Sequence, residues 1–194
     1  MLAGVSDVST QVNRSLPGLR DRLRDATAAA HRELDAQLSS FDLTVMAGYR
    51  RFLRASAGAL LPLEAALVEA GVARMFPDWP ERSRSAAIAA DLGRLGSAAQ
   101  STVSVPPLTS GGMLGTMYVL EGSRLGAKFL LKEVADVADP RIAKATSYLS
   151  HGAGKRLWQS FLSRLQIEEV SDEDEVIEAA RTAFVAFERA ADRA

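Results

Sequence analysis

The sequence of 194 residues contains no cysteine, and this absence removes several classes of chemistry. Without cysteine the chain can form no disulfide, no thiolate metal site and no cysteine nucleophile. The absence also suits a reducing compartment, so we expect a cytoplasmic protein. Any catalysis must depend on other side chains or on a bound group.

The sequence also lacks a long apolar run and an excess of charge of one sign. No stretch approaches the ~20 apolar residues of a membrane-spanning helix, and the N-terminal MLAGVSDVSTQVNRS lacks the basic and apolar regions of a secretory signal. The 23 basic and 24 acidic residues are interspersed, so no overall field favours a polyanion. We therefore expect neither a membrane nor a nucleic acid as a partner.

Histidine is scarce, with two copies in the chain. Neither has a glutamate three residues before it, which argues against a helical di-iron site. His151 precedes Gly152 at a predicted helix C-terminus, where we interpret it as a surface cap favoured by the helix dipole. His31 is followed one helical turn later by Asp35, which can bind one ring nitrogen and leave the other for a metal. The alternative for this pair is a solvated histidine beside an aspartate.

The pattern that is present is helical. Apolar residues recur at a spacing of three and four, no convincing strand appears, and 47% hydrophobic residues suffice for one core. We predict an all-α, single domain over residues 16–194, after a disordered tail over residues 1–15. Pro62 is expected to kink or divide the second helix, and Asp139 and Ser171 are expected as N-caps. The predicted helices cover residues 16–40, 46–71, 81–99, 118–133, 139–152, 155–166 and 171–193.

The predicted fourth helix is unusual because it contains two interior glycines, Gly122 and Gly126. Each costs about 1 kcal/mol relative to alanine, so something should use the space that they leave. Helical spacing puts them on one face with Gly115, between the rings of Tyr118 and Phe129. Close crossing by another helix is the commoner use of such a strip and is favoured by the spacing alone. A flat ligand is the alternative, and it would need a second wall.

A row of basic residues leads along the first helix to His31. Arg24 lies two turns before the histidine and Arg20 one turn further back. If a metal macrocycle with carboxylate arms were bound at His31, this row could pair with those arms. The alternative is an ordinary solvated face that also carries Asp21 and Asp25.

Two segments, LRDATAAAHRELD and LGTMYVLEGSRLGAKFLL, carry a family resemblance. Together they resemble the biliverdin-producing heme oxygenases, in particular the bacterial enzymes associated with bacteriophytochromes. The likeness continues through AGYRRFLRASAGALLPLEAAL, FPDWPERSR and LWQSFLSRL, so it covers nearly the whole chain after the tail, and EGSRLGA is its most specific part. It implies a heme-oxygenase-like helical bundle in which heme lies between the first helix and the glycine helix.

The resemblance also assigns residues. His31 matches the proximal iron ligand of the family and Asp35 the acidic residue that orients it, while Arg24 and Tyr118 match positions that contact the heme propionates. Gly122 and Gly126 match the distal glycines. The heme-contacting residues implied are Arg24, Thr27, Asp35, Tyr118, Gly122, Gly126 and Phe129, with His31 on the iron.

On the distal helix the sequence departs from parts of the family. Ser123 stands where animal relatives have an aspartate, and Arg124 stands where some bacterial members have asparagine. In heme oxygenation the oxygen must attack the porphyrin's own meso carbon, so a bare backbone without a strong side-chain acid suits the distal side. The resemblance therefore implies that Gly122, Ser123 and Gly126 are the catalytic positions.

The function implied is the cleavage of heme with O2 and reducing equivalents to biliverdin, CO and free iron. The electron donor expected is a ferredoxin or a flavoprotein reductase, and a bacteriophytochrome is an expected recipient of biliverdin. A heme carrier or sensor on the same fold, without turnover, is the alternative function.

Overall fold

The computed structural model describes residues 18–101 and 103–194, so the predicted tail over residues 1–15 lies outside the described part. In this part the regular secondary structure is entirely helical, and no strand is present. The all-α prediction is confirmed. The helices are α1 (Leu19–Ser39), α2 (Met46–Glu69), α3 (Val72–Met75), α4 (Trp79–Arg82), α5 (Ser85–Arg94), α6 (Ser110–Ala135), α7 (Pro140–Lys144), α8 (Ser147–Ser150), α9 (Leu157–Ile167) and α10 (Glu173–Asp192).

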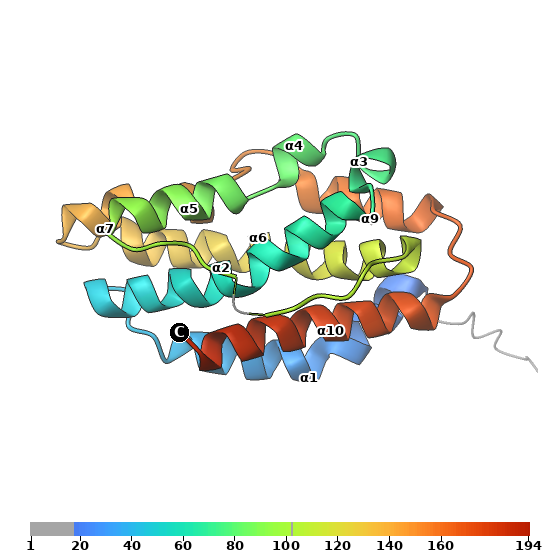
Figure 1. Ribbon diagram of the computed structural model, residues 1–194, viewed down its shortest axis with the longest axis horizontal. Coiled ribbons are helices and arrows are strands. Elements are labelled where there is room, and N and C mark those ends of the chain that lie inside the picture. Colours follow the sequence, from blue (N-terminus) through green and yellow to red (C-terminus); the bar gives the residue numbers. More distant parts are fainter. Residues whose placement is uncertain (1–17, 102) are drawn as a thin grey trace, which may run out of the picture.

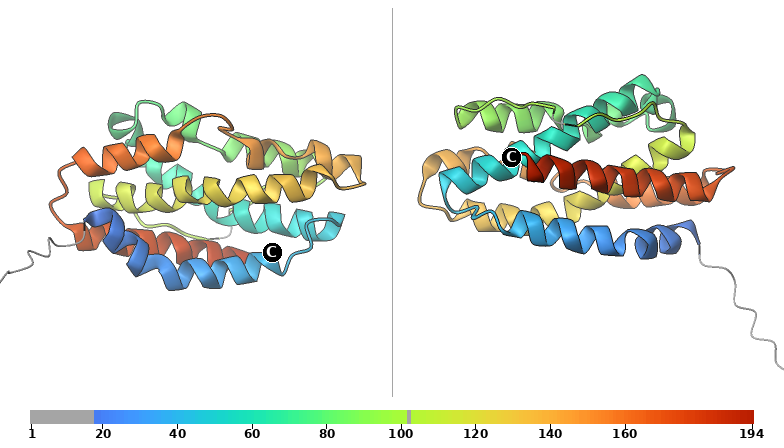
Figure 2. Two further views of the ribbon diagram at one scale, coloured as in Figure 1. Left: turned by 180° about the vertical axis from the view of Figure 1, so that it is seen from behind. Right: turned by 60° about the horizontal axis from the view of Figure 1, so that its bottom comes forward.

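The long helices form a bundle around α10 (Figure 1). Helix α10 packs against α1, α2 and α6, and α6 also packs against α8 and α9. In Figure 2 (left), α1 and α6 run in the same direction along the bundle. Because the two helices are parallel, one turn beyond any contact between them leads to another pair of neighbouring residues.

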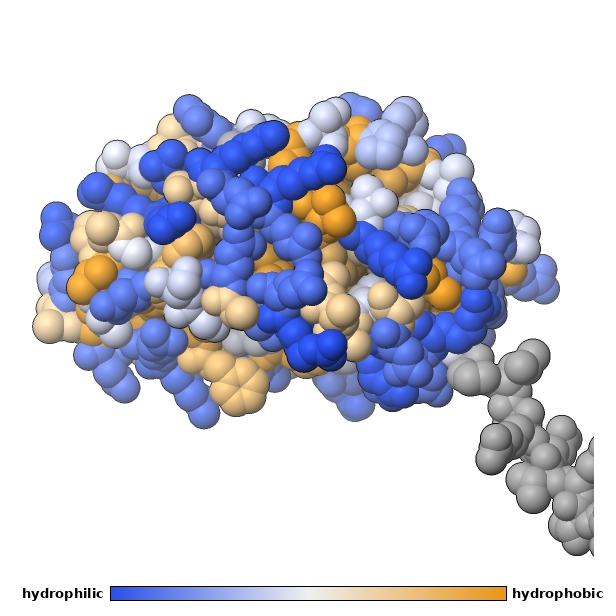
Figure 3. Space-filling model, turned by 90° about the horizontal axis from the view of Figure 1, so that it is seen from below, coloured by the Kyte–Doolittle hydropathy of each residue, from blue (hydrophilic) through white to orange (hydrophobic). Residues whose placement is uncertain are grey.

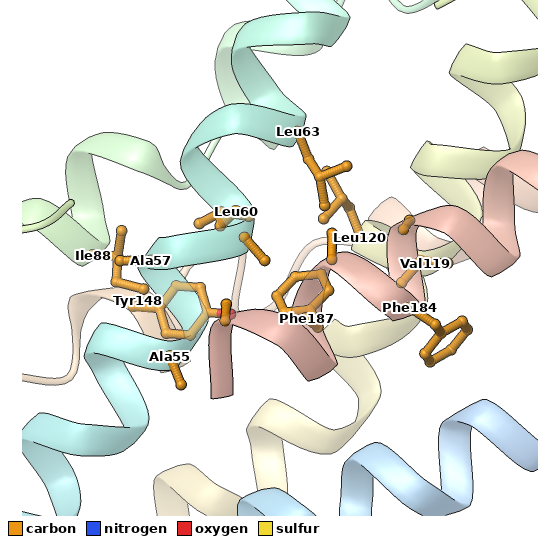
Figure 4. Close-up of a cluster of buried hydrophobic side chains, with 14 of the residues drawn as sticks. Ala55, Ala57, Leu60, Leu63, Ile88, Val119, Leu120, Tyr148, Phe184 and Phe187 are labelled. Atoms are coloured by element: carbon orange, nitrogen blue, oxygen red, sulfur yellow. The ribbon is translucent and has the colours of Figure 1, made fainter. Parts of the chain in front are cut away.

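The core lies where α2, α6 and α10 meet. Helix α2 is buried around much of its circumference because small residues such as Ala55, Ala57 and Ala59 let its neighbours approach closely. Figure 4 shows Leu120 of α6 and Phe187 of α10 in the same apolar cluster. The first half of α6 is therefore fixed in the core, whereas most residues after Glu121 are partly or fully exposed.

Gly115 is the place where another helix crosses α6 closely. A Cβ at this position would lie 2.1 Å from the carbonyl oxygen of Val176 in α10, a distance that no side chain could tolerate. Helix packing thus explains the first glycine of the predicted strip. It does not explain the two that follow.

Several predicted helix boundaries are wrong. Helix α2 continues through Pro62 without division. The last helix is capped by Asp172 instead of Ser171, because the Asp172 carboxylate accepts hydrogen bonds from the N–H groups of Asp174 and Glu175. Asp139 is confirmed as a cap, but the helix predicted over 139–152 is two short helices, α7 and α8.

The helix predicted over 81–99 is also divided, for a reason that lies outside the segment. The buried carboxylate of Glu64 in α2 accepts hydrogen bonds from the backbone N–H groups of Arg84 and Ser85. It thereby supplies the N-terminal cap of α5, which begins at Ser85 instead of at residue 81. A cap that comes from another helix leaves no local signal in the sequence.

The face seen from below in Figure 1 is mostly hydrophilic, with small apolar patches between the polar side chains (Figure 3). This is typical of helices that turn their apolar sides inward. Of the helices in the described ranges, none has the length and hydropathy to cross a membrane.

Candidate functional site

The predicted metal ligand lies in the middle of α1 beside the predicted carboxylate. His31 Nδ1 is 2.9 Å from Asp35 Oδ2, and the two side chains are 62% and 65% exposed. The imidazole also lies against Phe184 of α10, with ring centroids 5.9 Å apart. Because the carboxylate is bound at Nδ1, Nε2 is the nitrogen left for a metal.

One helical turn before His31, α1 meets α6. Thr27 is buried, its hydroxyl donates to the carbonyl oxygen of Leu23 at 2.8 Å, and its side chain lies next to that of Tyr118. Burial raises the pKa of Tyr118, and the neighbouring Thr27 hydroxyl and the positive charges of Arg20 and Arg24 act in the opposite direction. Both guanidinium groups therefore lie near the Tyr118 side chain.

The basic row also has the acidic neighbours that the alternative interpretation expected. Arg24 pairs with Asp21 at 3.0 Å and with Asp25 at 3.1 Å, and the three side chains are largely exposed. A carboxylate group of a bound ligand could therefore replace Asp21 or Asp25 as the partner of Arg24. The cost would be small, because the existing ion pairs are exposed to solvent. The basic row, Arg20 and Arg24, therefore remains available to bind carboxylate groups at the part of α1 that faces Tyr118.

The contact between Thr27 and Tyr118 aligns the histidine with the two glycines. Because α1 and α6 run in the same direction, one turn beyond this contact leads to His31 on α1 and to Gly122 on α6. A Cβ at Gly126 would meet no atom of the described residues within 4 Å, apart from the adjacent backbone of its own helix. The close crossing favoured by the spacing is thus wrong for Gly126, and the space beside it is open.

Trp158, in the first turn of α9, was missed by the sequence analysis. Its ring lies against Tyr118, with centroids 5.6 Å apart. Among the described residues outside the adjacent backbone of α6, it is the only group within 4 Å of a Cβ built at Gly122, at 3.7 Å. Trp158 therefore forms a wall beside the glycine face. No local pattern predicts this wall, because Tyr118 and Trp158 are forty residues apart and the segment LWQSFLSRL has the spacing of an ordinary amphipathic helix.

Two other predicted site residues have surroundings that differ from the expected ones. Phe129 is 75% exposed, although it shares the glycine face of α6. The Ser123 hydroxyl donates to the carbonyl oxygen of Leu120 at 2.8 Å and accepts from the Arg84 guanidinium at 3.0 Å. In the structure Ser123 is therefore bound to its own helix and to the segment before α5.

A buried network of charges holds α6 on the side opposite the glycines. Glu121 pairs with Arg82 at 3.1 Å and with Arg124 at 3.0 Å, and the Glu121 and Arg82 side chains are each only 2% exposed. Arg84, on the same side, donates to the carbonyl oxygen of Leu120 at 2.8 Å. These contacts fix the backbone next to Gly122 without occupying the glycine face.

His151 is the C-cap of α8, as expected, but it is partly buried and belongs to this network. Arg124 Nη1 lies 3.3 Å from both its Nδ1 and its carbonyl oxygen. Burial, followed by the charges of Arg124 and Arg84, lowers the pKa of His151. A histidine held in this way is a poor candidate for a second metal ligand.

The arrangement fits heme. A flat ligand needs an iron-binding nitrogen on one side, a bare surface on the other and cations for its carboxylates. The described residues supply His31 with a free nitrogen, Gly126 with open space, and Arg20 and Arg24 beside Tyr118. The described part of the chain contains no cluster of three or more metal-binding side chains, which suits a metal that brings its own macrocycle.

Comparison with known proteins agrees with this class of all-α, heme-binding protein. A family model described as heme oxygenase matches residues 18–193. The chain is 31% identical over 176 residues to heme oxygenase PigA of Pseudomonas aeruginosa, with 88% of each sequence covered. Its fold is similar to that of a Neisseria meningitidis heme oxygenase solved with NO and CO bound, with a TM-score of 0.73, 23% identity and 90% of each chain covered.

The chain therefore belongs to the heme oxygenase family. It is an enzyme whose substrate is heme, and the reaction is heme degradation. This excludes the alternative of a carrier or sensor that binds heme without turnover.

Proposed function

We propose that the enzyme cleaves heme with O2 and reducing equivalents to biliverdin, CO and free iron. Heme, when bound, supplies both the iron that activates oxygen and the ring that is opened. The protein supplies the ligand, the orientation of the ring and a distal side that excludes competing chemistry. Each of these contributions can be assigned to residues of α1 and α6.

His31 binds the iron through Nε2, and Asp35 holds the imidazole by its Nδ1. This carboxylate fixes the tautomer and increases the basicity of the liganding nitrogen. Phe184 of α10 packs against the imidazole ring of His31. Because both polar side chains are more than half exposed, the pair can adjust when heme is bound.

The heme carboxylates are bound where Arg24 of α1 and Tyr118 of α6 lie, with Thr27 beside them. Arg24 supplies charge and Tyr118 supplies a hydroxyl group. Phe129, exposed at the other end of the glycine face, covers the heme edge when the substrate is present. Heme binding would thus give this large apolar side chain a partner.

The open backbone at Gly126 is the observation that carries the proposal. In the described part of the chain, nothing beyond the adjacent helix backbone lies within 4 Å of a Cβ built there, although the same helix is packed closely at Gly115. Gly122 and Gly126 let oxygen reach the ring edge, because no side chain occupies the distal space. Ser123 is proposed to help hold the distal proton donors, through the hydroxyl that Arg84 positions.

The test is to mix the purified protein with hemin, add reductant in air and follow the absorption spectrum. We expect one-to-one binding with a histidine-ligated spectrum and its conversion to that of biliverdin. His31→Ala should remove the histidine ligation, whereas His151→Ala should retain it. Loss of the histidine-ligated spectrum in the His151 variant alone would show that the ligand assignment is wrong.

The biological partners are proposed from the resemblance and the chemistry. The reaction requires electrons, so a ferredoxin or a flavoprotein reductase is the donor expected. Supply of biliverdin to a bacteriophytochrome is the proposed use of the product. Transfer of biliverdin from the enzyme to a bacteriophytochrome lacking its chromophore, followed by the spectrum of the photoreceptor, tests this last proposal.

A further inference from the structure

Behind α6, on the side opposite the glycines, lies a cavity that the proposed heme chemistry does not use. It has a volume of about 70 Å³ and is bounded by α6, α8 and the start of α9. This is room for a few water molecules or a small ion, and it is too small for a tetrapyrrole. Trp158 separates it from the glycine face, since the indole lines the cavity and also lies against Tyr118.

The side chains around this cavity are cationic. Of the described residues that line it, none is acidic, and the basic ones are Arg84, Arg124, His151, Lys128 and Lys155. Carboxylates outside the cavity balance two of them, since Glu121 pairs with Arg124 and Glu81 with Lys155. Positive charge therefore remains in excess at the cavity itself.

Arg84 is the most deeply buried cation at this cavity. Its side chain is almost fully buried, the residue being 2% exposed, and it forms no ion pair with any acidic side chain of the described residues. Its guanidinium lies over the Tyr148 ring, 5.2 Å from the centroid, and its hydrogen bonds are to the neutral Leu120 carbonyl and Ser123 hydroxyl, while its Nε has no hydrogen-bond partner among the described residues. A buried, unpaired guanidinium is costly, and a bound anion would remove that cost.

The N-terminus of α9 adds backbone donors to the same cavity. Leu157, Trp158 and Gln159 form its first turn and all line the cavity. No side chain caps this helix of 11 residues, and its first backbone bond is from Ser160 N to the Arg156 carbonyl. The three N–H groups before Ser160 are therefore available to an anion, and the helix dipole favours one there.

We propose that this cavity binds a small tetrahedral oxyanion of the phosphate type. The helix N-terminus supplies donors on one side, and Arg84 and Arg124 supply charge-assisted hydrogen bonds on the other. The exposed Lys128 covers the opening. Because Arg124 lies between Gly122 and Gly126 in α6, the bound anion would also hold the glycine helix from behind.

Calorimetric titration of the heme-free full chain with inorganic phosphate tests this site, at an ionic strength kept constant with sodium chloride. The proposed heme reaction does not enter, so the result is independent of it. We expect one saturable site per chain. Lys128→Gln should weaken phosphate binding about tenfold, because a charge-assisted contact is lost. Lys132→Gln, a matched exposed lysine one turn later in α6, should leave the affinity unchanged.

Arg84→Lys provides a second arm, since it keeps the buried charge but removes Nε and the planar guanidinium. It should weaken binding more than Lys128→Gln, and circular dichroism will show whether it is folded. If it does not fold, the two lysine variants still decide the question. No saturable heat, an equal effect of added chloride, or equal losses in the Lys128 and Lys132 variants would overturn the proposal.

Discussion

His31 Nδ1 lies 2.9 Å from Asp35 Oδ2, one turn apart on the exposed face of α1. The contact determines which ring nitrogen is free to bind iron. It also makes Asp35 responsible for the basicity of that nitrogen, although the carboxylate does not contact the metal. The strength of the iron bond should therefore depend on a residue that can be changed without removing the ligand.

We expect Asp35→Ala to bind hemin through His31 but with a weaker iron–histidine bond. The imidazole loses its partner at Nδ1, so its tautomer is no longer fixed and its donor strength falls. Resonance Raman spectroscopy of the reduced complex should show a lower iron–histidine stretching frequency. Asp25→Ala removes an exposed carboxylate of the same helix and is the control. An equal frequency in the Asp35 and Asp25 variants would contradict the assigned role.

Gly126→Leu should separate stability from catalysis. The space beside Gly126 is open in the heme-free chain, so the substitution should raise the free energy of unfolding by about 0.5–1 kcal/mol, the usual gain on replacing a glycine within a helix. Heme should still bind through His31, and biliverdin formation should fall strongly because the side chain enters the distal space. Urea unfolding and the rate of biliverdin formation measure the two effects.

Gly115→Ala is the matched control, because its Cβ would collide with the Val176 carbonyl of α10. It should lower stability by about 1–3 kcal/mol, the usual cost of overpacking. The correctly folded fraction should still turn over heme. A Gly126→Leu enzyme that forms biliverdin at the wild-type rate would refute the proposed distal role.

Stability should fall with decreasing pH through His151. Its folded-state pKa is below the ordinary 6.5 because of burial and the charges of Arg124 and Arg84. As the pH falls through 6.5, the unfolded chain therefore takes up the proton before the folded chain does, and the free energy of unfolding decreases. His151→Gln should reduce this pH dependence between about pH 7 and pH 5 in urea unfolding. Equal pH dependence in wild type and His151→Gln would contradict the assignment.

Glu121→Gln should be among the most destabilising substitutions. Glu121 and Arg82 are both almost fully buried, so removing the carboxylate charge leaves Arg124 without a carboxylate partner and Arg82 with only the partly exposed Asp78. We expect a loss of about 3–5 kcal/mol in the free energy of unfolding, measured in urea. Glu81→Gln disrupts the exposed pair with Lys155 and should change stability little. Similar effects of the two substitutions would show that the buried network does not hold α6.

The sequence alone determined the helical class and the position of the candidate ligand. Apolar periodicity identified the main helices, because burial of one face imposes a spacing of three and four residues wherever a helix packs on a core. His31 and Asp35 could be paired from the sequence because residues four apart on a helix meet whatever surrounds them. The chain has no cysteine and two histidines, so few side chains were candidates for a metal ligand. The family resemblance then gave the remaining site residues.

Only the tertiary structure decided how the glycines are used. Gly115, Gly122 and Gly126 have the same local pattern, yet one is packed against α10, one lies beside Trp158 and one faces open space. These differences depend on how α6 crosses helices that are distant in the sequence, and local spacing carries no information about such crossings. For the same physical reason the cap that Glu64 provides to α5 and the unpaired charge of Arg84 appear only once the helices are packed.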